Sequence, residues 1–377
     1  MILIPCFWHK PKISRHSGIF PSRSTTTTAF VFDVILLSID SAVLLQYADA
    51  ILIGEGEDAV PELLEHEIPF NDSSFPAGWV WKDNSGELHS TGLAPMVDIS
   101  ELPLPAWSLY PIDKYLQFTQ SIRGFPVMHI MSSRGCVHNC TFCDYESGRV
   151  QVRRRPAEHV VDEMQELSER YSRFGLKDFY FFDPSFMSSR KWSKQLYTEL
   201  SNIGKFNWGC LARVDEIDKN ILSHARESGC QYINFGVEAA SDRILKMVGK
   251  GTNIQQVREA FQLCHDTGIR PGAFLLIGLP QETPEDIETM KNLLKDIRPA
   301  FINISIAAPF PGTVLAKQFK NDILTDDAFK FSDYFPDRTL FKNLKTDPVN
   351  AQEEITAFYK ENVNSTGYVN PVTFQEY

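Results

Sequence analysis

Short apolar segments alternate with amphipathic helical segments from Val127 to Ala307. The strand pattern recurs six times, at Val127–Ser132, Phe179–Asp183, Asn207–Arg213, Tyr232–Glu238, Ala273–Leu279 and Phe301–Ala307. Apolar residues at helical spacing predict five intervening helices, at Pro156–Arg173, Arg190–Ile203, Lys219–Ser228, Ile254–Thr267 and Pro284–Ile297. Strands separated by helices predict right-handed crossovers and a parallel sheet, so we expect an α/β fold.

The strands carry apolar residues on one face and polar residues on the other. In the fourth strand Ile233, Phe235 and Val237 alternate with polar positions that include Asn234 and Glu238. A sheet covered by helices on both faces would have continuously apolar strands instead. We therefore predict a curled sheet, a partial (β/α)6 TIM-like barrel, with a site on its concave face.

The flanking regions are less regular. Ala50–Ile53 predicts a short strand, followed by a turn and a helix to about His66, and Trp79–Trp81 with Glu87–His89 predicts at most a small hairpin. We expect a short truncated α/β segment at residues 1–68, a linker at 69–120, the barrel at 121–313 and an irregular C-terminal extension at 314–377.

Composition and charge exclude several classes of protein. The net charge of −11 argues against general binding to nucleic acid, which requires clustered Lys and Arg. The basic run Arg153-Arg154-Arg155 is interpreted as a solvated approach to a helix. No apolar run reaches the roughly 18 residues of a membrane span, and the first residues have the reverse order of a secretion signal. We expect a cytoplasmic protein with reduced thiols, no membrane and no nucleic-acid partner.

Three cysteines lie on the loop after the first barrel strand. Cys136, Cys140 and Cys143 have the spacing C-x3-C-x2-C. A structural zinc site takes four ligands, and His138, between two of these cysteines, would be an awkward fourth. Three thiolates suit a 4Fe-4S cluster with one iron open to another ligand. The other cysteines of the barrel, Cys210, Cys230 and Cys264, are expected to be buried small hydrophobic residues.

The cysteine motif, with Phe142 before its third cysteine, resembles the radical S-adenosylmethionine superfamily. Further segments over residues 102–313 resemble the branch that often carries an N-terminal cobalamin domain, namely Phe182–Phe186, Cys210–Asp215, Gly236–Ala239 and Gly278–Thr283. The resemblance implies an oxygen-sensitive enzyme that binds a 4Fe-4S cluster and S-adenosylmethionine. It further implies reductive cleavage to a 5′-deoxyadenosyl radical, which abstracts hydrogen from a small-molecule substrate. Flavodoxin or ferredoxin would be the reductant.

Several strand-end residues are candidate contacts of S-adenosylmethionine under this resemblance. We expect Asp183 to accept from its ammonium group, Arg213 to pair with its carboxylate, and Glu238 to accept from its ribose hydroxyls or its ammonium group. The backbone at Phe142 and the apolar Leu276/Ile277 region are expected to hold its adenine. Two alternatives stay open at this stage. Arg213 and Glu238 also suit a buried structural ion pair, and Asp183, which precedes a proline, also suits a turn.

The N-terminal segment bears on cobalamin. Gly54-Glu55-Gly56-Glu57 resembles the last turn of a cobalamin domain, and the acidic residues of this G-x-G-x-x-A sequence argue against a dinucleotide site. Too few residues precede it for several βα units. Neither His9 nor His16 lies in the D-x-H-x-x-G loop of that domain. We therefore expect no tight cobalamin binding by this chain.

Three functions remain open from the sequence. The first is a radical S-adenosylmethionine enzyme that abstracts hydrogen from an unknown substrate; a family member that never uses cobalamin would catalyse a rearrangement, a cyclisation or a sulfur insertion. The second is a cobalamin-dependent methyltransferase, with cobalamin supplied by a fuller chain or a partner. The third is a non-catalytic, metal-stabilised binding module.

Overall fold

The computed structural model describes residues 45, 50–65, 75–83, 85–143, 151–324, 340–364 and 368–370. The chain forms two compact units, which meet in sequence between Asp98 and Ile99. Among the described residues, no helix combines the length and the apolar character needed to cross a bilayer. The sequence predictions for residues 1–49 lie outside the described residues, apart from residue 45.

The first unit contains a small antiparallel sheet and one helix. Strands β1 (Ala50–Leu52), β2 (Trp79–Lys82) and β3 (Leu88–Ser90) lie in that order, and helix α2 spans Gly56–Glu65. The indole of Trp81 stacks on Phe75 with a centroid separation of 4.1 Å. The predicted strand, helix and hairpin are confirmed. The hairpin pairs with β1, so this unit extends beyond residue 68.

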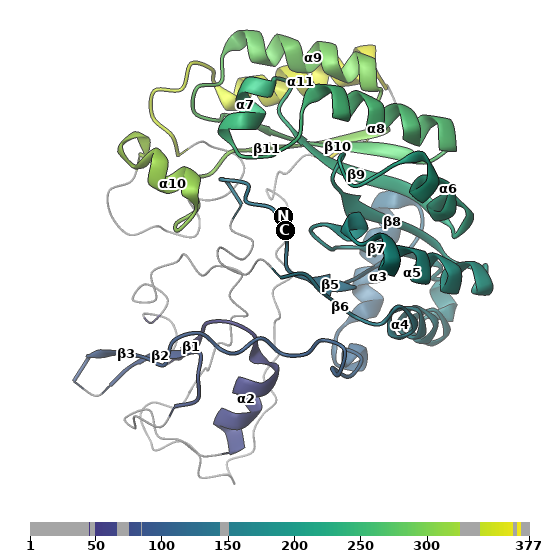
Figure 1. Ribbon diagram of the computed structural model, residues 1–377, viewed down its shortest axis with the longest axis vertical. Coiled ribbons are helices and arrows are strands. Elements are labelled where there is room, and N and C mark those ends of the chain that lie inside the picture. Colours follow the sequence, from purple (N-terminus) through teal and green to yellow (C-terminus); the bar gives the residue numbers. More distant parts are fainter. Residues whose placement is uncertain are drawn as a thin grey trace. The chain divides into compact units, whose positions relative to one another are not determined.

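The second unit is built on a parallel sheet whose strands lie in sequence order. They are β4 (Val127–Ile130), β7 (Asp178–Phe181), β8 (Asn207–Ala212), β9 (Cys230–Glu238), β10 (Arg270–Ile277), β11 (Phe301–Ile306) and β12 (Tyr368–Asn370). The connecting helices are α4 (Ala157–Arg170), α5 (Arg190–Ile203), α6 (Lys219–Glu227), α8 (Ile254–Thr267) and α9 (Pro284–Ile297). These helices cover one side of the curled sheet (Figure 1). The predicted partial (β/α)6 barrel is confirmed.

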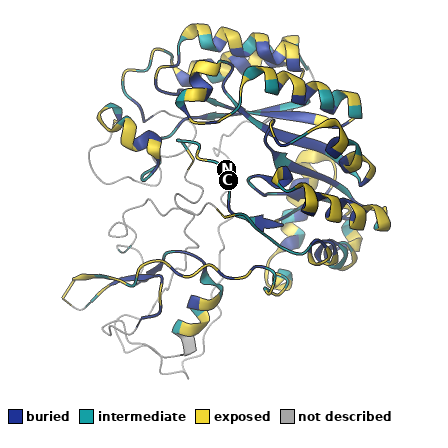
Figure 2. Ribbon diagram, in the orientation of Figure 1, coloured by how far each residue is buried: buried dark blue, intermediate teal, exposed yellow. Residues whose placement is uncertain are grey.

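Alternation along the strands separates the two faces of the sheet. Ile233, Phe235 and Val237 of β9 lie in the main hydrophobic core. Tyr180 and Tyr232 belong to a separate small cluster, which also receives Leu211. Figure 2 shows buried residues along the strands and exposed residues on the outer surfaces of the helices. The side chains that do not enter the helix-facing core are therefore available to the concave face.

Several elements were not predicted. They are α3 (Ile112–Arg123), the hairpin β5 (Ser133–Arg134) with β6 (Arg153–Arg154), α7 (Asp242–Met247), α10 (Val314–Gln318), α11 (Pro348–Asn362), β12, and the 3-10 turns η1 (Trp107–Leu109), η2 (Ser172–Phe174), η3 (Phe186–Ser188) and η4 (Lys320–Asp322). The expectation of an irregular C-terminal extension was wrong for α11. Asp347 caps this helix, and Ala351, Ile355 and Tyr359 bury one face of it at a spacing of four residues.

Candidate active site

The cysteine loop follows β5 and is held by backbone hydrogen bonds. Gly135 has a φ of 98°, and a Cβ atom there would overlap the carbonyl oxygen of Gln151, so only glycine suits this position. Farther along, Thr141 N donates to Val248 O and Leu315 N donates to Thr141 O, each at 2.8 Å. The loop is thus fixed to Val248, just after α7, and to the first turn of α10.

The thiols of this loop lie in a partly buried, electropositive setting. Cys136 and Cys140 are half-buried and Cys143 is exposed. Burial raises the pKa of Cys136 and of Cys140, while the cations Lys250 and Arg213 act in the opposite direction on the pKa of Cys140. Metal binding requires thiolates, and neighbouring cations stabilise them. Three cysteine donors on one loop beside two cations fit a site that holds an anionic iron–sulfur cluster.

A buried ion pair lies beside this loop. Lys250 Nζ donates to Glu238 Oε1 at 2.8 Å, and the two side chains are 8% and 13% exposed. Burial lowers the pKa of Lys250, but Glu238 and Cys140 raise it, and the net shift is upward. The charges of this pair therefore reach as far as the thiol of Cys140.

The backbone around Glu238 is adapted to this pair. Glu238 ends β9 with a φ of 64°, in the left-handed region that side chains rarely adopt. The register between β9 and β10 shifts at this point, because Phe274 lies opposite Gly236 and Leu275 lies opposite Glu238. A Cβ atom on Gly236 would lie 2.6 Å from Lys250 Nζ. A bulge and a glycine thus make room for a carboxylate and an ammonium group above the sheet.

Arg213 forms its own ion pair at the end of β8. Its Nε and Nη2 atoms donate to the two carboxylate oxygens of Asp215, each at 2.9 Å, and Nη2 also donates to Lys250 O at 2.8 Å. The alternative of an Arg213–Glu238 pair was wrong, because each residue has a different partner. Arg213 is 5% exposed. Its hydrogen bonds neutralise Asp215 and fix the turn that carries Lys250.

Asp183 lies away from solvent and faces the start of the cysteine loop. Its side chain is 0% exposed and accepts hydrogen bonds from Ser132 and Ser133. Burial raises its pKa, and these hydrogen bonds act in the opposite direction. The structure gives its carboxylate protein partners instead of the predicted access to the ammonium group of S-adenosylmethionine.

The two predicted adenine contacts have different positions. Phe142 is partly buried against the apolar cluster that includes Ala239 and Leu279, at the ends of β9 and β10. Ile277 is 0% exposed and lies in the helix-facing core, which contradicts a side-chain contact on the concave face. Its neighbour Leu276 is partly buried and packs with the Phe142 cluster. Alternation along β10 makes Leu276 the better candidate.

Lys250 is the functional candidate that the sequence analysis missed. The sequence Gly249-Lys250-Gly251-Thr252 has part of a phosphate-loop pattern but lacks its first glycine. In the structure Gly249 and Gly251 have φ values of 62° and 73°, which turn the chain and direct Lys250 to Glu238. The sequence feature that could have identified Lys250 is its position between two glycines after a short helix.

A histidine of the loop lies close to a buried carboxylate. His138 Nε2 lies 3.6 Å from Glu216 Oε1, and Ser185 Oγ donates to that same oxygen. An open pocket here is lined by Val137, His138, Met187, Ser188, Arg190, Asp215 and Glu216. Cys210, Cys230 and Cys264 are 0% exposed, as predicted.

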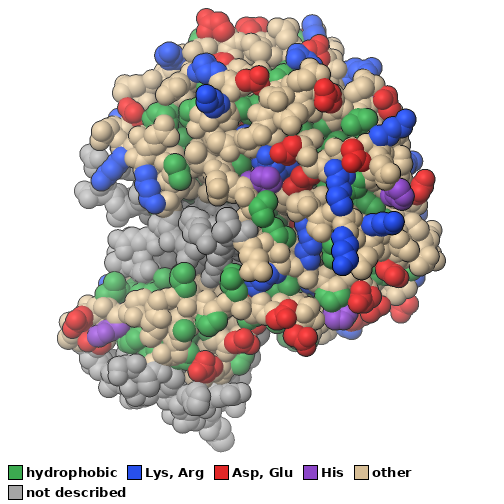
Figure 3. All heavy atoms as spheres, viewed as in Figure 1, with side chains coloured by type: hydrophobic (Ala, Val, Ile, Leu, Met, Phe, Trp, Pro, Cys, Tyr) green, Lys and Arg blue, Asp and Glu red, His purple; other side chains and the backbone are tan. Residues whose placement is uncertain are grey.

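The basic run has a different role from the predicted one. Arg154 donates to Ser188 Oγ at 2.5 Å and to backbone carbonyls, and Arg155 pairs with buried Glu163 at 2.5 Å. The run is therefore partly buried, and the expectation of a solvated helix approach was wrong. On the face drawn in Figure 3, acidic and basic side chains are interspersed over the described surface.

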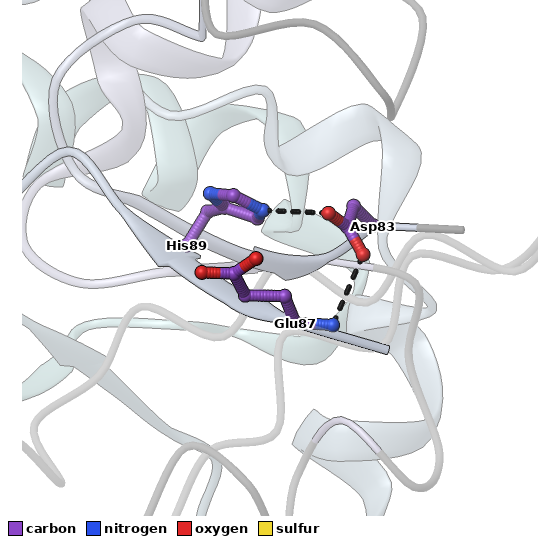
Figure 4. A group of neighbouring side chains, drawn as sticks. All are labelled: Asp83, Glu87 and His89. Carbon is purple, nitrogen blue, oxygen red and sulfur yellow. Dashed lines mark hydrogen bonds and ion pairs between the residues drawn. The ribbon is translucent and has the colours of Figure 1, made fainter. Parts of the chain in front are cut away.

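A second group of polar residues lies on the β2–β3 hairpin. Figure 4 shows that Asp83 accepts from His89 Nε2 and from the backbone of Glu87, each at 3.0 Å. Hydrogen bonds from Ser85 and His89 hold the pKa of Asp83 well below its usual range. Among the described residues these three side chains could converge on one metal ion. Their hydrogen bonds are those of a tight turn, and they account for the arrangement without a ligand.

Comparisons with known proteins indicate the superfamily of the barrel. The chain matches the profile of the Radical SAM superfamily over residues 130–294. This match assigns residues 130–294 to the radical S-adenosylmethionine superfamily. This is a superfamily of enzymes that use a 4Fe-4S cluster and S-adenosylmethionine, so the non-catalytic alternative is not supported.

Sequence relatives in this superfamily include methyltransferases and cyclases. An "uncharacterized methyltransferase" of Pyrococcus horikoshii is 31% identical over 270 residues, which cover 71% of this chain and 57% of that one. The anaerobic magnesium-protoporphyrin IX monomethyl ester cyclase of Rubrivivax gelatinosus is 28% identical over 295 residues, 76% of this chain and 51% of the cyclase. The chain thus spans about half the length of the curated relatives it matches.

Solved structures share the fold. The radical S-adenosylmethionine methyltransferase TsrM of Kitasatospora setae, with cobalamin and a 4Fe-4S cluster bound, has a TM-score of 0.62 and 18% identity, covering 82% of this chain and 64% of TsrM. The cobalamin-dependent enzyme OxsB has a TM-score of 0.56 and 20% identity, covering 69% of this chain and 38% of OxsB. At this identity the likeness concerns the fold.

Proposed function

We propose that Cys136, Cys140 and Cys143 ligate one 4Fe-4S cluster, and that S-adenosylmethionine binds beside it at the Glu238–Lys250 pair. The observation that carries this proposal is the position of that pair. Its two charges act on the thiol of Cys140, and both side chains are nearly buried. Buried opposite charges beside three thiols suit a zwitterionic ligand next to a cluster.

The methionyl part of S-adenosylmethionine carries an ammonium and a carboxylate group. Glu238 offers an acceptor for the first, and Lys250 offers a donor for the second. Arg213 keeps the turn at Lys250 in place through the carbonyl of that residue. Phe142 and Leu276 belong to one apolar cluster and offer a surface for adenine.

When bound, a reduced cluster and S-adenosylmethionine supply the electron transfer and radical chemistry of the superfamily, and the protein supplies ligands, orientation and exclusion of water. The small-molecule substrate and a flavodoxin or ferredoxin as reductant remain part of the proposal. Cluster thiolates persist in a reducing compartment, which favours the cytoplasm.

Anaerobic reconstitution with iron and sulfide, followed by reduction with dithionite in the presence of S-adenosylmethionine, tests this function. Mass spectrometry should detect 5′-deoxyadenosine with the parent chain and with the control Cys264→Ala, whose thiol is buried in the core. The Cys140→Ala variant should give none. Absence of the product from a fully reconstituted parent chain would contradict the proposal.

A second candidate function is cobalamin-dependent methyl transfer. It is favoured by the methyltransferase of Pyrococcus horikoshii and by the fold shared with TsrM. The prediction that this chain does not bind cobalamin tightly concerns residues outside the described part. Growth with cobalamin, followed by absorbance and cobalt analysis of the purified chain, tests it. Retained corrinoid would place methyl transfer first.

A further inference from the structure

The Asp183 carboxylate lies just after β7 and accepts hydrogen bonds from two consecutive residues. Ser132 N lies 3.0 Å from Oδ1 and 3.2 Å from Oδ2 of Asp183. The hydroxyl groups of Ser132 and Ser133 donate to Oδ1 at 3.0 and 2.5 Å. The side chain is 0% exposed, so it presents no free edge to a ligand.

The two serines lead directly into the cysteine loop. Ser132 follows β4, and its carbonyl oxygen accepts from Arg155 N at 2.9 Å. Ser133 begins β5 and pairs with Arg154 of β6. The constrained Gly135 comes next and is followed by the first cysteine. The direction in which the loop leaves the sheet is therefore set at the Asp183–serine contacts.

We propose that Asp183 is a positioning residue for the cluster loop and makes no contact with S-adenosylmethionine. This inference rests on the proposed cluster ligands. Without the carboxylate, one buried amide and two buried hydroxyl groups lose their acceptor, which is costly in the interior of a protein. Loss of these hydrogen bonds should destabilise the turn between β4 and β5, from which the cysteine loop continues.

The two roles of Asp183 predict different results for two variants. A cofactor contact depends on the negative charge, so Asp183→Asn would weaken binding of S-adenosylmethionine and leave the loop unchanged. A positioning residue depends on its hydrogen bonds, which Asn retains in part because serine hydroxyls both donate and accept. Ser132→Ala/Ser133→Ala removes two of the donors but leaves the charge. The control is Ser228→Ala, a buried serine that donates to Ala225 O.

Hydrogen exchange of the full, cluster-free chain is the first measurement. In Ser132→Ala/Ser133→Ala, peptides covering residues 131–143 should exchange about tenfold faster, as expected for loss of hydrogen bonds to a charged group. Peptides covering residues 221–237 should be unchanged. In the Ser228→Ala control, peptides 131–143 should exchange at the parent rate. Unchanged exchange of peptides 131–143 in the double variant would overturn the inference, whether or not the parent chain assembles a cluster.

Cluster assembly and cofactor affinity are the second measurement. The reconstituted double variant should retain less iron and show an altered electron paramagnetic resonance signal after reduction, while Asp183→Asn keeps a parental affinity for S-adenosylmethionine. Loss of that affinity in Asp183→Asn with a parental cluster signal would restore the cofactor-contact role and overturn the inference. A parent chain without iron would instead contradict the proposed function.

Discussion

Lys250 Nζ donates a hydrogen bond of 2.8 Å to Glu238 Oε1, which joins a residue after helix α7 to the end of strand β9. The pair forms where β9 bulges and where Gly236 has no side chain. Opposite charges in a buried setting stabilise each other but leave a large penalty when one is removed. The pair is thus sensitive to small changes, and two predictions use that sensitivity.

Lys250→Met should leave Glu238 as a buried carboxylate without its cation. We expect a loss of about 3 kcal/mol in the free energy of unfolding. The affinity of the reconstituted chain for S-adenosylmethionine should fall by about tenfold or more, because a charged hydrogen bond is lost. Chemical denaturation and equilibrium binding measure the two effects. Lys246→Met, at an exposed position of α7, is the matched control and should change neither. Parental binding by Lys250→Met would contradict the proposed contact.

Gly236→Ala should disturb the Glu238–Lys250 ion pair, because Gly236 lies beside the pair in β9. The new Cβ atom would lie 2.6 Å from Lys250 Nζ, so the pair must separate or shift. Overpacking of this kind costs about 1–3 kcal/mol. A double-mutant cycle with Lys250→Met checks the mechanism, since the alanine should cost less once the ammonium group is absent. Strictly additive losses would show that the alanine acts through Glu238 Oε1, which its Cβ atom would also overlap, and not through Lys250.

The buried carboxyl group of Glu282 should make the free energy of unfolding depend on pH. It is 4% exposed and accepts from Gly278 N at 2.7 Å, and burial raises its pKa from 4.5 to about 7. The folded chain therefore holds this proton more tightly than the unfolded chain. The resulting stabilisation is complete below pH 4.5 and is lost as the pH rises to about 7.

Glu282→Gln should remove this dependence, because a neutral amide keeps an acceptor for Gly278 N. The difference in unfolding free energy between the Gln variant and the parent should grow by about 3 kcal/mol in favour of the variant between pH 4.5 and 7. Urea denaturation over this pH range measures it, and the other titrating groups cancel in the difference. A constant difference would refute the raised pKa.

Local patterns in the sequence were sufficient to predict much of the barrel. Helices α5, α8 and α9 have the predicted bounds, because Ser189 and Asn253 cap the first two and Gly204 and Gly268 end them in the left-handed conformation. Alternation in β10 could also have shown that Ile277 faces the helices.

The partners of the site residues were beyond local patterns. Asp183 meets serines about 50 positions earlier, and Lys250 reaches Glu238 only because of a bulge and two left-handed glycines. Such contacts depend on strand register and tertiary packing, which spacing along the chain does not encode. The cysteine motif was recognisable from the sequence because its three cysteines lie on one loop.

We expect the three cysteines of this loop to hold a four-iron cluster, and Mössbauer spectroscopy of the chain reconstituted anaerobically with ⁵⁷Fe measures this. The spectrum should be that of a 4Fe-4S cluster at about four irons per chain. The same spectrum should appear for Cys210→Ala and disappear for Cys136→Ala. Tightly bound stoichiometric zinc without iron in the parent chain, or a parental spectrum in Cys136→Ala, would contradict it.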